Sequence, residues 1–301
     1  YWWGYKGIVP AMIALALTNY VFYKYNSNKL KVHKISFLLK EQYPLIKNML
    51  LLGLTLMIAS LIGTFINYLL NMYIGRYGSL NDVGMYQAAN SITNQYVGII
   101  FTAMSLDYFP RLAAVSNDHE KIQDIVNKQI DIVLNIIAPL CCMLIICAPL
   151  IIRILLTNEF LYIIDLIRWM SISLFFKACI FPLGYISFAK GDKKTFFWLE
   201  GVWSNALNLI ISLISYSIWG LSGMGIALCI IYSICLFVYI GVTRRFYFFK
   251  FSITNYKLIV MLAFFILLTF IFSLINNFII SYTCMSFSCI SCSIICFKNL
   301  N

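Results

Sequence analysis

Long apolar runs separated by short polar connections make up most of the chain. A helix needs about 20 residues to cross about 30 Å of hydrocarbon. Runs of about that length are found at residues 7–24, 48–74, 83–109, 129–152, 161–189, 195–216, 220–243, 256–278 and 280–297, the last of them short. Because the connections are brief, the pattern predicts an all-α, up-and-down multi-helix bundle without a soluble catalytic domain.

Composition places this bundle in a membrane. Of the 301 residues, 62% are hydrophobic and 11% are charged, whereas about a quarter of a soluble domain is charged. A net charge of +11 is also typical of nucleic-acid binding, but the basic residues lie between the apolar runs. Seventeen of the 22 Lys and Arg residues fall on one side of the predicted spans and three on the other. The positive-inside rule makes the basic side cytoplasmic, and we expect no nucleic-acid partner.

Three spans carry polar residues at helical spacing, although a face toward lipid should be apolar. The three polar stripes are Ser60, Thr64, Asn67 and Asn71; then Gln87, Asn90, Ser91, Asn94, Thr102 and Ser105; then Glu200, Ser204, Asn208 and Ser212. Any single Asn or Ser is more typical of an interhelical hydrogen bond. Whole polar faces on three helices indicate a shared hydrophilic interior.

Two charged residues lie deep in predicted spans. Lys177 is 13 residues from Lys190 in the next cytoplasmic turn, which is about 19 Å of helix and beyond the reach of its side chain. It is a candidate cation for an anionic substrate group, and the alternative is a buried ion pair between helices. Glu200 lies about 9 Å into its helix and is a candidate carrier of a proton or a cation.

Other charges near the span ends have local partners. Arg168 can reach the outer interface, and Asp165 lies one helical turn away from it. Asp107 and Arg111 are four residues apart at the cytoplasmic end of the third span and are expected to pair there.

No catalytic or metal-binding pattern is visible. The two histidines, His33 and His119, lie in connections, and no H-E-x-x-H, G-x-S-x-G or P-loop is present. We therefore expect no enzyme activity and no cofactor. The spacing of Cys284, Cys289, Cys292 and Cys296 is similar to an iron–sulfur run, but this Ser-rich apolar tail has no polar loop to enclose a cluster, so we expect no metal site.

Three segments together resemble a known family. Residues 83–90 (VGMYQAAN), 107–112 (DYFPRL) and 184–191 (GYISFAKG) have the order and spacing of Wzx-type flippases. These are translocases of lipid-linked oligosaccharides (O-antigen or enterobacterial common antigen) in the multidrug/oligosaccharidyl-lipid/polysaccharide superfamily. The resemblance covers residues 7–245. Lys177 and Glu200 stand where the family has a lysine and a glutamate, whereas Asn71 stands where relatives often have an arginine.

The resemblance implies two six-helix lobes around a cationic cavity. Residues 1–24 would be the last helix of the N-terminal lobe, 25–47 a basic cytoplasmic linker, 48–245 the C-terminal lobe and 246–301 extra hydrophobic helices. Because the chain opens on Tyr1 without a methionine, we expect about five further helices upstream.

The implied function is the flipping of undecaprenyl-diphosphate-linked O-antigen repeat units across a bacterial inner membrane, for lipopolysaccharide biosynthesis. Lys177 and Arg168 would attract the diphosphate or acidic sugars, and Glu200 or Asp107 would couple transport to an ion gradient. Membrane lipid, an O-antigen polymerase and a chain-length regulator are the expected partners. The polar side chains expected to bind sugar hydroxyls are Asn67, Asn71, Gln87, Asn90, Asn94 and Asn208.

Two alternatives stay open. A drug/cation antiporter of the same superfamily would need a more apolar and acidic cavity than the polar stripes offer. A membrane-embedded O-antigen polymerase would need a large periplasmic loop with arginines, whereas the external connections here are short.

Overall fold

The computed structural model describes residues 7–27, 39–275 and 277–300, which form helices and short connections and contain no strand. The chain divides into two compact units, Tyr1–Met49 and Leu50–Asn301. The first unit contains α1 (Ile8–Ser27) and the first residues of α2 (Leu39–Tyr77). Of the predicted cytoplasmic linker, residues 28–38 lie outside the described residues.

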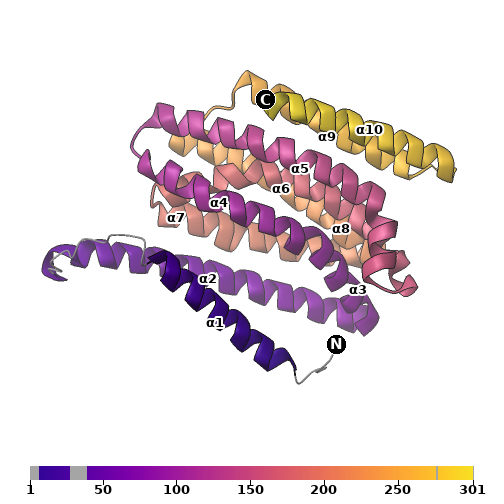
Figure 1. Cartoon of the computed structure of the whole chain (residues 1–301), viewed down its shortest axis with the longest axis horizontal. Coiled ribbons are helices and arrows are strands. Elements are labelled where there is room, and N and C mark those ends of the chain that lie inside the picture. The colour runs from indigo at the N-terminus through magenta and orange to yellow at the C-terminus, as the bar shows by residue number, and fades with distance from the viewer. Residues whose placement is uncertain (1–6, 28–38, 276, 301) are drawn as a thin grey trace. The chain divides into compact units, whose positions relative to one another are not determined.

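The second unit is a helical bundle (Figure 1). After α2, the helix α3 (Leu80–Asn90), the π-helical segment η2 (Ser91–Gln95) and α4 (Tyr96–Ala114) follow one another without a break. Then come α5 (His119–Leu155), the 3-10 turn η3 (Asn158–Ile163) and α6 (Ile164–Ala189). The chain continues through α7 (Lys193–Phe196), the π-helical η4 (Phe197–Trp203), α8 (Ser204–Tyr247), α9 (Ile253–Ser273) and α10 (Phe278–Leu300).

Short polar side chains start these helices. Ser79 and Asp82 form a capping box at the start of α3, and Asp118, Asp192 and Ser252 each accept a hydrogen bond from a backbone amide of the first turn that follows. Such caps satisfy amides that have no partner within the helix. They fix the points at which α3, α5, α7 and α9 leave their connections.

The long helix α8 is a hairpin of two antiparallel arms. Gly220 has φ 59° and ψ −141°, a backbone conformation that side chains with a Cβ rarely adopt. Ser204 on one arm lies 3.7 Å from the thiol of Cys235 on the other. Near the turn, a Cβ at Gly223 would meet the backbone of Ser215. The two predicted spans at 195–216 and 220–243 are therefore confirmed as separate arms.

The central helix of the bundle is α6, which packs between α5 and α8. Most of its residues are buried, among them Leu174, Phe175, Ala178 and Cys179. The helices α9 and α10 pack on each other and on α5. Cys284, Cys289, Cys292 and Cys296 lie along α10, and the described residues contain no group of three or more metal-ligand side chains that could hold a metal ion.

Six described stretches are long and apolar enough to cross a membrane. They are Met49–Tyr77, His119–Leu155, Asn158–Ala189, Lys193–Tyr247, Ile253–Ser273 and Ile279–Asn299. The predicted spans at 7–24 and 83–109 also form helices but are not among the six. Together the stretches confirm an all-α, multi-pass membrane bundle.

The connections that follow α4, α6 and α8 carry basic residues and lie together at one end of the second unit. Nζ of Lys190 donates to the carbonyl of Ser116 at 3.0 Å, and the Tyr247 hydroxyl donates to the Asp192 carboxylate at 2.8 Å. Burial alone would raise the pKa of Asp192. Hydrogen bonds from Thr195 and Tyr247 outweigh this effect and hold the pKa below its ordinary value. This end, called the basic end below, corresponds to the side that the sequence predicts to be cytoplasmic.

Candidate functional site

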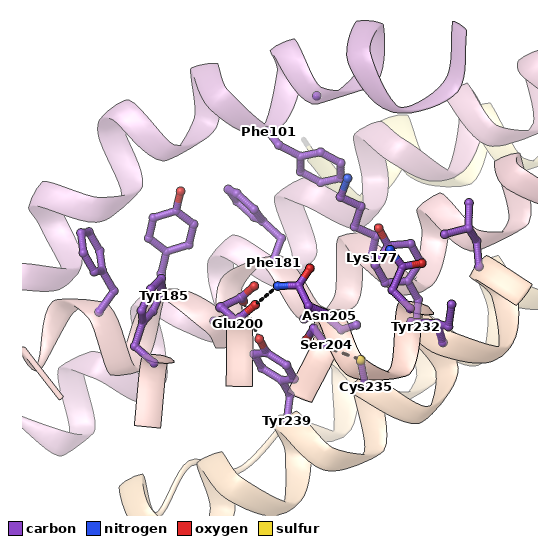
Figure 2. Close-up of a pocket in the computed structure, with 18 of the residues that line it drawn as sticks. Phe101, Lys177, Phe181, Tyr185, Glu200, Ser204, Asn205, Tyr232, Cys235 and Tyr239 are labelled. Atoms are coloured by element: carbon purple, nitrogen blue, oxygen red, sulfur yellow. Dashed lines mark hydrogen bonds between the residues drawn. The ribbon is translucent and has the colours of Figure 1, made fainter. Parts of the chain in front are cut away.

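A cavity of about 580 Å³ opens within the second unit, between α4, α6, η4 and the two arms of α8 (Figure 2). Most of its wall is apolar or aromatic. The hydrophilic groups that line it include Lys177 from α6, Glu200 from η4, and Ser204, Asn205 and Asn208 from the first arm of α8. The cavity therefore combines one cation, one carboxylate and several amide or hydroxyl groups.

The Lys177 ammonium is held by an amide and two aromatic rings. Nζ donates to Oδ1 of Asn94 at 3.3 Å, and Nδ2 of Asn94 donates to Oδ1 of Asn90 at 2.9 Å. Nζ also lies 5.9 Å from the ring centroids of both Phe101 and Tyr232. Among the described residues no carboxylate lies within ion-pair distance of Lys177. In the described part of the chain, no adjacent carboxylate therefore neutralises its charge, and the nearest acidic group of the cavity lining is Glu200, beyond ion-pair distance.

The Glu200 carboxylate lies in the same cavity and has a different set of partners. The Tyr239 hydroxyl donates to Oε1 of Glu200, and the side-chain amide of Asn205 donates to its backbone carbonyl at 3.0 Å. Gly184 of α6 faces the carboxylate so closely that a Cβ there would lie 3.0 Å from Oε1. In Figure 2, Glu200 of η4 and Tyr239 of the second arm of α8 point toward each other.

Two polar residues at this site, Asn94 and Glu200, belong to π-helical turns. Asn94, the partner of Lys177, belongs to η2, and Glu200 belongs to η4. A π-turn inserts extra backbone into a helix and changes the direction in which its side chains point, and such turns are frequent at functional sites. One irregular turn therefore supplies the carboxylate that lines the cavity, and the other supplies the amide that holds Lys177 of the regular helix α6.

A row of aromatic rings runs along the cavity from Lys177 toward the basic end, and we call it the aromatic strip. Successive ring centroids are 5.1 Å apart from Phe101 to Phe181 and from Phe181 to Tyr185. They are 6.3 Å apart from Tyr185 to Phe188 and 5.6 Å apart from Phe188 to Phe196. The strip gives the cavity a continuous aromatic wall.

Several of the predicted site residues are brought together and others are not. Lys177, Glu200 and Asn208 line the cavity. Asn94 accepts a hydrogen bond from Lys177, and Asn90 accepts one from Asn94. Asn67 and Gln87 are exposed and do not line it. Asn71 is also outside the lining, with a buried side-chain oxygen that has no hydrogen-bond partner.

The two ion pairs that helical spacing predicted are both present. Arg168 pairs with Asp165 at 3.3 Å, and Arg111 pairs with Asp107 at 2.6 Å. Arg168 and Asp107 therefore lie outside the cavity lining, although the resemblance gave both a role in transport.

Several parts of the cavity wall were not identified from the sequence. They are Tyr232, Tyr239, Asn205 and the aromatic strip. A signal was present, because Tyr232, Cys235 and Tyr239 are three and four residues apart and share one face of the second arm of α8. On α6, Phe181 and Phe188 share the face of Lys177 in the same way. In a chain so rich in aromatic residues, this spacing is not distinctive without the packing.

A helical membrane bundle that encloses charged and polar side chains in a cavity is typical of a transporter. A family model described as "Polysaccharide biosynthesis protein" matches residues 2–165. The chain therefore belongs to the polysaccharide biosynthesis protein family.

The structure is also similar to that of lipid II flippase MurJ in an inward closed conformation, with a TM-score of 0.54 and 16% sequence identity. The match covers 89% of this chain and 57% of that one, so the chain spans little more than half the length of that protein. No curated protein sequence matches the chain. The family model confirms a polysaccharide biosynthesis protein, and the structural likeness shows that the fold is that of the flippase over the matched part.

Proposed function

We propose that this protein moves undecaprenyl-diphosphate-linked O-antigen repeat units from the cytoplasmic to the periplasmic leaflet of a bacterial inner membrane. The observation that carries the proposal is the Lys177 ammonium, which faces a membrane cavity without a carboxylate partner among the described residues. We further propose that residues 48–245 form one lobe of the complete flippase and that the two lobes alternate access to the cavity.

The chemistry of Lys177 suits a diphosphate. Placing a lysine at the centre of a membrane helix costs about 2.5–3.5 kcal/mol on insertion scales, so such residues usually have a partner or a function. Asn94 is a neutral acceptor and occupies one of the three N–H donors of Lys177. The remaining donors and the full positive charge match the oxygens of a diphosphate, which accept charge-assisted hydrogen bonds.

The walls of the cavity suit an oligosaccharide. Asn205 and Asn208 carry amide groups that can exchange hydrogen bonds with sugar hydroxyls. The aromatic strip offers flat apolar faces between Lys177 and the basic end. The sugars would lie along the strip with the diphosphate at Lys177. The flipped repeat unit would then be the substrate of an O-antigen polymerase with its chain-length regulator.

Glu200 is the group we propose for coupling to a proton or sodium gradient. Its carboxylate lines the same cavity as Lys177, with one oxygen held by Tyr239. A change in its charge would therefore alter the field in which the diphosphate binds. Asp107 is less suited to this role because it pairs with Arg111 at an exposed position. On this proposal Glu200→Gln protein would flip substrate at a rate that no longer responds to an imposed gradient.

The experiment that tests the function is deletion of the gene in its own host. Loss of a flippase leaves lipid-linked repeat units on the cytoplasmic leaflet, so we expect them to accumulate while the surface polysaccharide disappears. A plasmid copy should restore both. Unchanged surface polysaccharide with no accumulated lipid-linked intermediate would contradict the proposal.

The observation that favours a second candidate, a drug/cation antiporter, is the Glu200 carboxylate between aromatic walls. A lipophilic cation could bind there, but Lys177 in the same cavity would repel it. The two candidates differ in a simple measurement. An antiporter would give the host resistance to lipophilic cations, and deletion would abolish that resistance without changing the surface polysaccharide.

A further inference from the structure

A second cavity, of about 260 Å³, lies where α5, α9 and α10 meet near the basic end. Asp131 and Asn135 of α5 line one wall, and Thr254 and Lys257 of α9 line another. Asn299, near the end of α10, completes the polar lining. None of these residues belongs to the transport cavity described above.

Two buried oxygen atoms in this second cavity have no hydrogen-bond partner. They are Oδ1 of Asp131 and Oδ1 of Asn135, and Asn135 is 3% exposed. The amide orientation of Asn135 is fixed, because its Nδ2 donates to the carbonyl of Asp131 at 2.8 Å and exchanging the two atoms would place oxygen against oxygen. An unsatisfied buried acceptor costs about 1–3 kcal/mol. A ligand that brings N–H or O–H donors would satisfy both oxygens.

A positive charge, that of Lys257, lies on the wall of the second cavity that α9 forms. Lys257 is exposed and lies one turn after Thr254 on the same face of α9. Within the described residues, neither Asp131 nor Lys257 forms an ion pair within 4.0 Å. A ligand that fits both walls would carry a positive donor group and a negative group a short distance apart.

The position of the second cavity matches the headgroup layer. The helix α9 has 21 residues, which corresponds to about 32 Å and just spans the hydrocarbon of a bilayer. Its first turns, which contain Thr254 and Lys257, therefore lie at the membrane surface. The last turn of α10, with Asn299, reaches the same level because α10 runs back along α9 (Figure 1).

We propose that the second cavity binds the headgroup of a phospholipid with a primary ammonium, namely phosphatidylethanolamine. The ammonium donates to Asp131 and Asn135, and the phosphate lies against Lys257 and the hydroxyl of Thr254. A bare metal cation would satisfy the two oxygens but leave Lys257 repelled. A phosphatidylcholine headgroup has the same charges but no N–H donor, and phosphatidylglycerol has no positive charge.

The test is lipid competition on the full chain, purified and delipidated in detergent, with bound lipid identified by native mass spectrometry. Equimolar phosphatidylethanolamine, phosphatidylcholine and phosphatidylglycerol are offered together. We expect phosphatidylethanolamine to be retained over the other two by about tenfold, the ratio that corresponds to about 1.4 kcal/mol. Equal retention of the three lipids would overturn the proposal, and it is the result expected if the Lys257 side chain or a metal ion fills the cavity.

Two variants and one control locate the site. Asp131→Asn removes the buried charge, and Asp124→Asn removes an exposed carboxylate two turns away on the same helix, where it pairs with Lys128. We expect the preference to disappear in the first variant and to persist in the second. Lys257→Gln, at an exposed position where folding is not at risk, should lose the preference as well. Retention of the preference in Asp131→Asn or in Lys257→Gln would overturn the assignment.

Discussion

Replacing Lys177 by methionine is the sharpest perturbation of the transport cavity. The substitution keeps the length of the side chain and removes its charge and its donors. Because methionine is apolar, we expect the helix itself to remain stable, with loss of the 3.3 Å hydrogen bond to Asn94. We therefore expect the change to act on substrate binding and to leave folding largely intact.

The expected loss follows from Coulomb's law. A unit charge about 4 Å from one phosphate charge gains about 4 kcal/mol at an effective dielectric constant of about 20. Desolvation of the ammonium and the phosphate offsets roughly half of this gain. The remaining gain of about 2 kcal/mol corresponds to a dissociation constant about 30-fold larger in the variant.

The assay is binding of a polyprenyl-diphosphate-linked oligosaccharide to purified protein in nanodiscs, compared with the monophosphate-linked analogue. Lys177→Met should weaken diphosphate binding and remove most of the preference over the monophosphate. Lys177→Arg should keep the preference because it keeps the charge. Lys194→Met, an exposed position outside the cavity lining, is the control. Unchanged binding by Lys177→Met at normal thermal stability would refute the reasoning.

Three further substitutions test the geometry around the cavity. Gly184→Ala places a Cβ 3.0 Å from Oε1 of Glu200 and should slow flipping severalfold, measured in proteoliposomes, while changing the melting temperature little. Gly223→Ala drives a Cβ into the backbone of Ser215 and should cost more than about 2 kcal/mol, seen as loss of folded protein on size exclusion. Asp192→Ala removes a helix cap and should cost about 1 kcal/mol at pH 7 in thermal unfolding. The pKa of Asp192 in the folded protein lies below its ordinary value of 3.8. The penalty is therefore fully present above pH 3.8 and is lost as the pH falls through the lower pKa of the folded protein.

Each glycine substitution has a control in the same region. Gly98 lines the same cavity as Gly184 but has open space where a Cβ would be added, so Gly98→Ala should flip normally. Gly241 lies on the same arm of α8 as Gly223 and also has open space, so Gly241→Ala should fold normally. Equal behaviour of each pair would show that the close approaches do not matter. Tyr247→Phe removes the hydrogen bond that Tyr247 donates to Asp192. If its loss of stability depends on pH in the same way as that of Asp192→Ala, the shared hydrogen bond is the cause.

Much of the helical plan could be predicted from the sequence because membrane helices leave a strong local signal. The apolar runs gave most of the spans, and Gly220 separates the two arms of α8 where the break between runs was expected. The pairs of Arg168 with Asp165 and of Asp107 with Arg111 also followed from helical spacing. These features depend on neighbours within four residues.

The details of the cavity could not be predicted because they depend on packing across long sequence separations. Asn94 meets Lys177 from 83 residues away, and its direction is set by a π-turn that has no sequence signature of its own. The polar stripe of α2 stays a prediction. Its spacing predicted a face toward the hydrophilic interior, but Asn67 is exposed and outside the cavity lining.

The central claim is that the protein flips a lipid linked to an oligosaccharide through a diphosphate. The most direct measurement reconstitutes the whole protein in liposomes that carry a fluorescent polyprenyl-diphosphate-linked oligosaccharide in both leaflets. A membrane-impermeant quencher then destroys the outer-leaflet signal. We predict that the protein brings the remaining half of the fluorescence within reach of the quencher, faster in wild type than in Lys177→Met. Fluorescence that stays half protected, as in protein-free liposomes, would contradict the account.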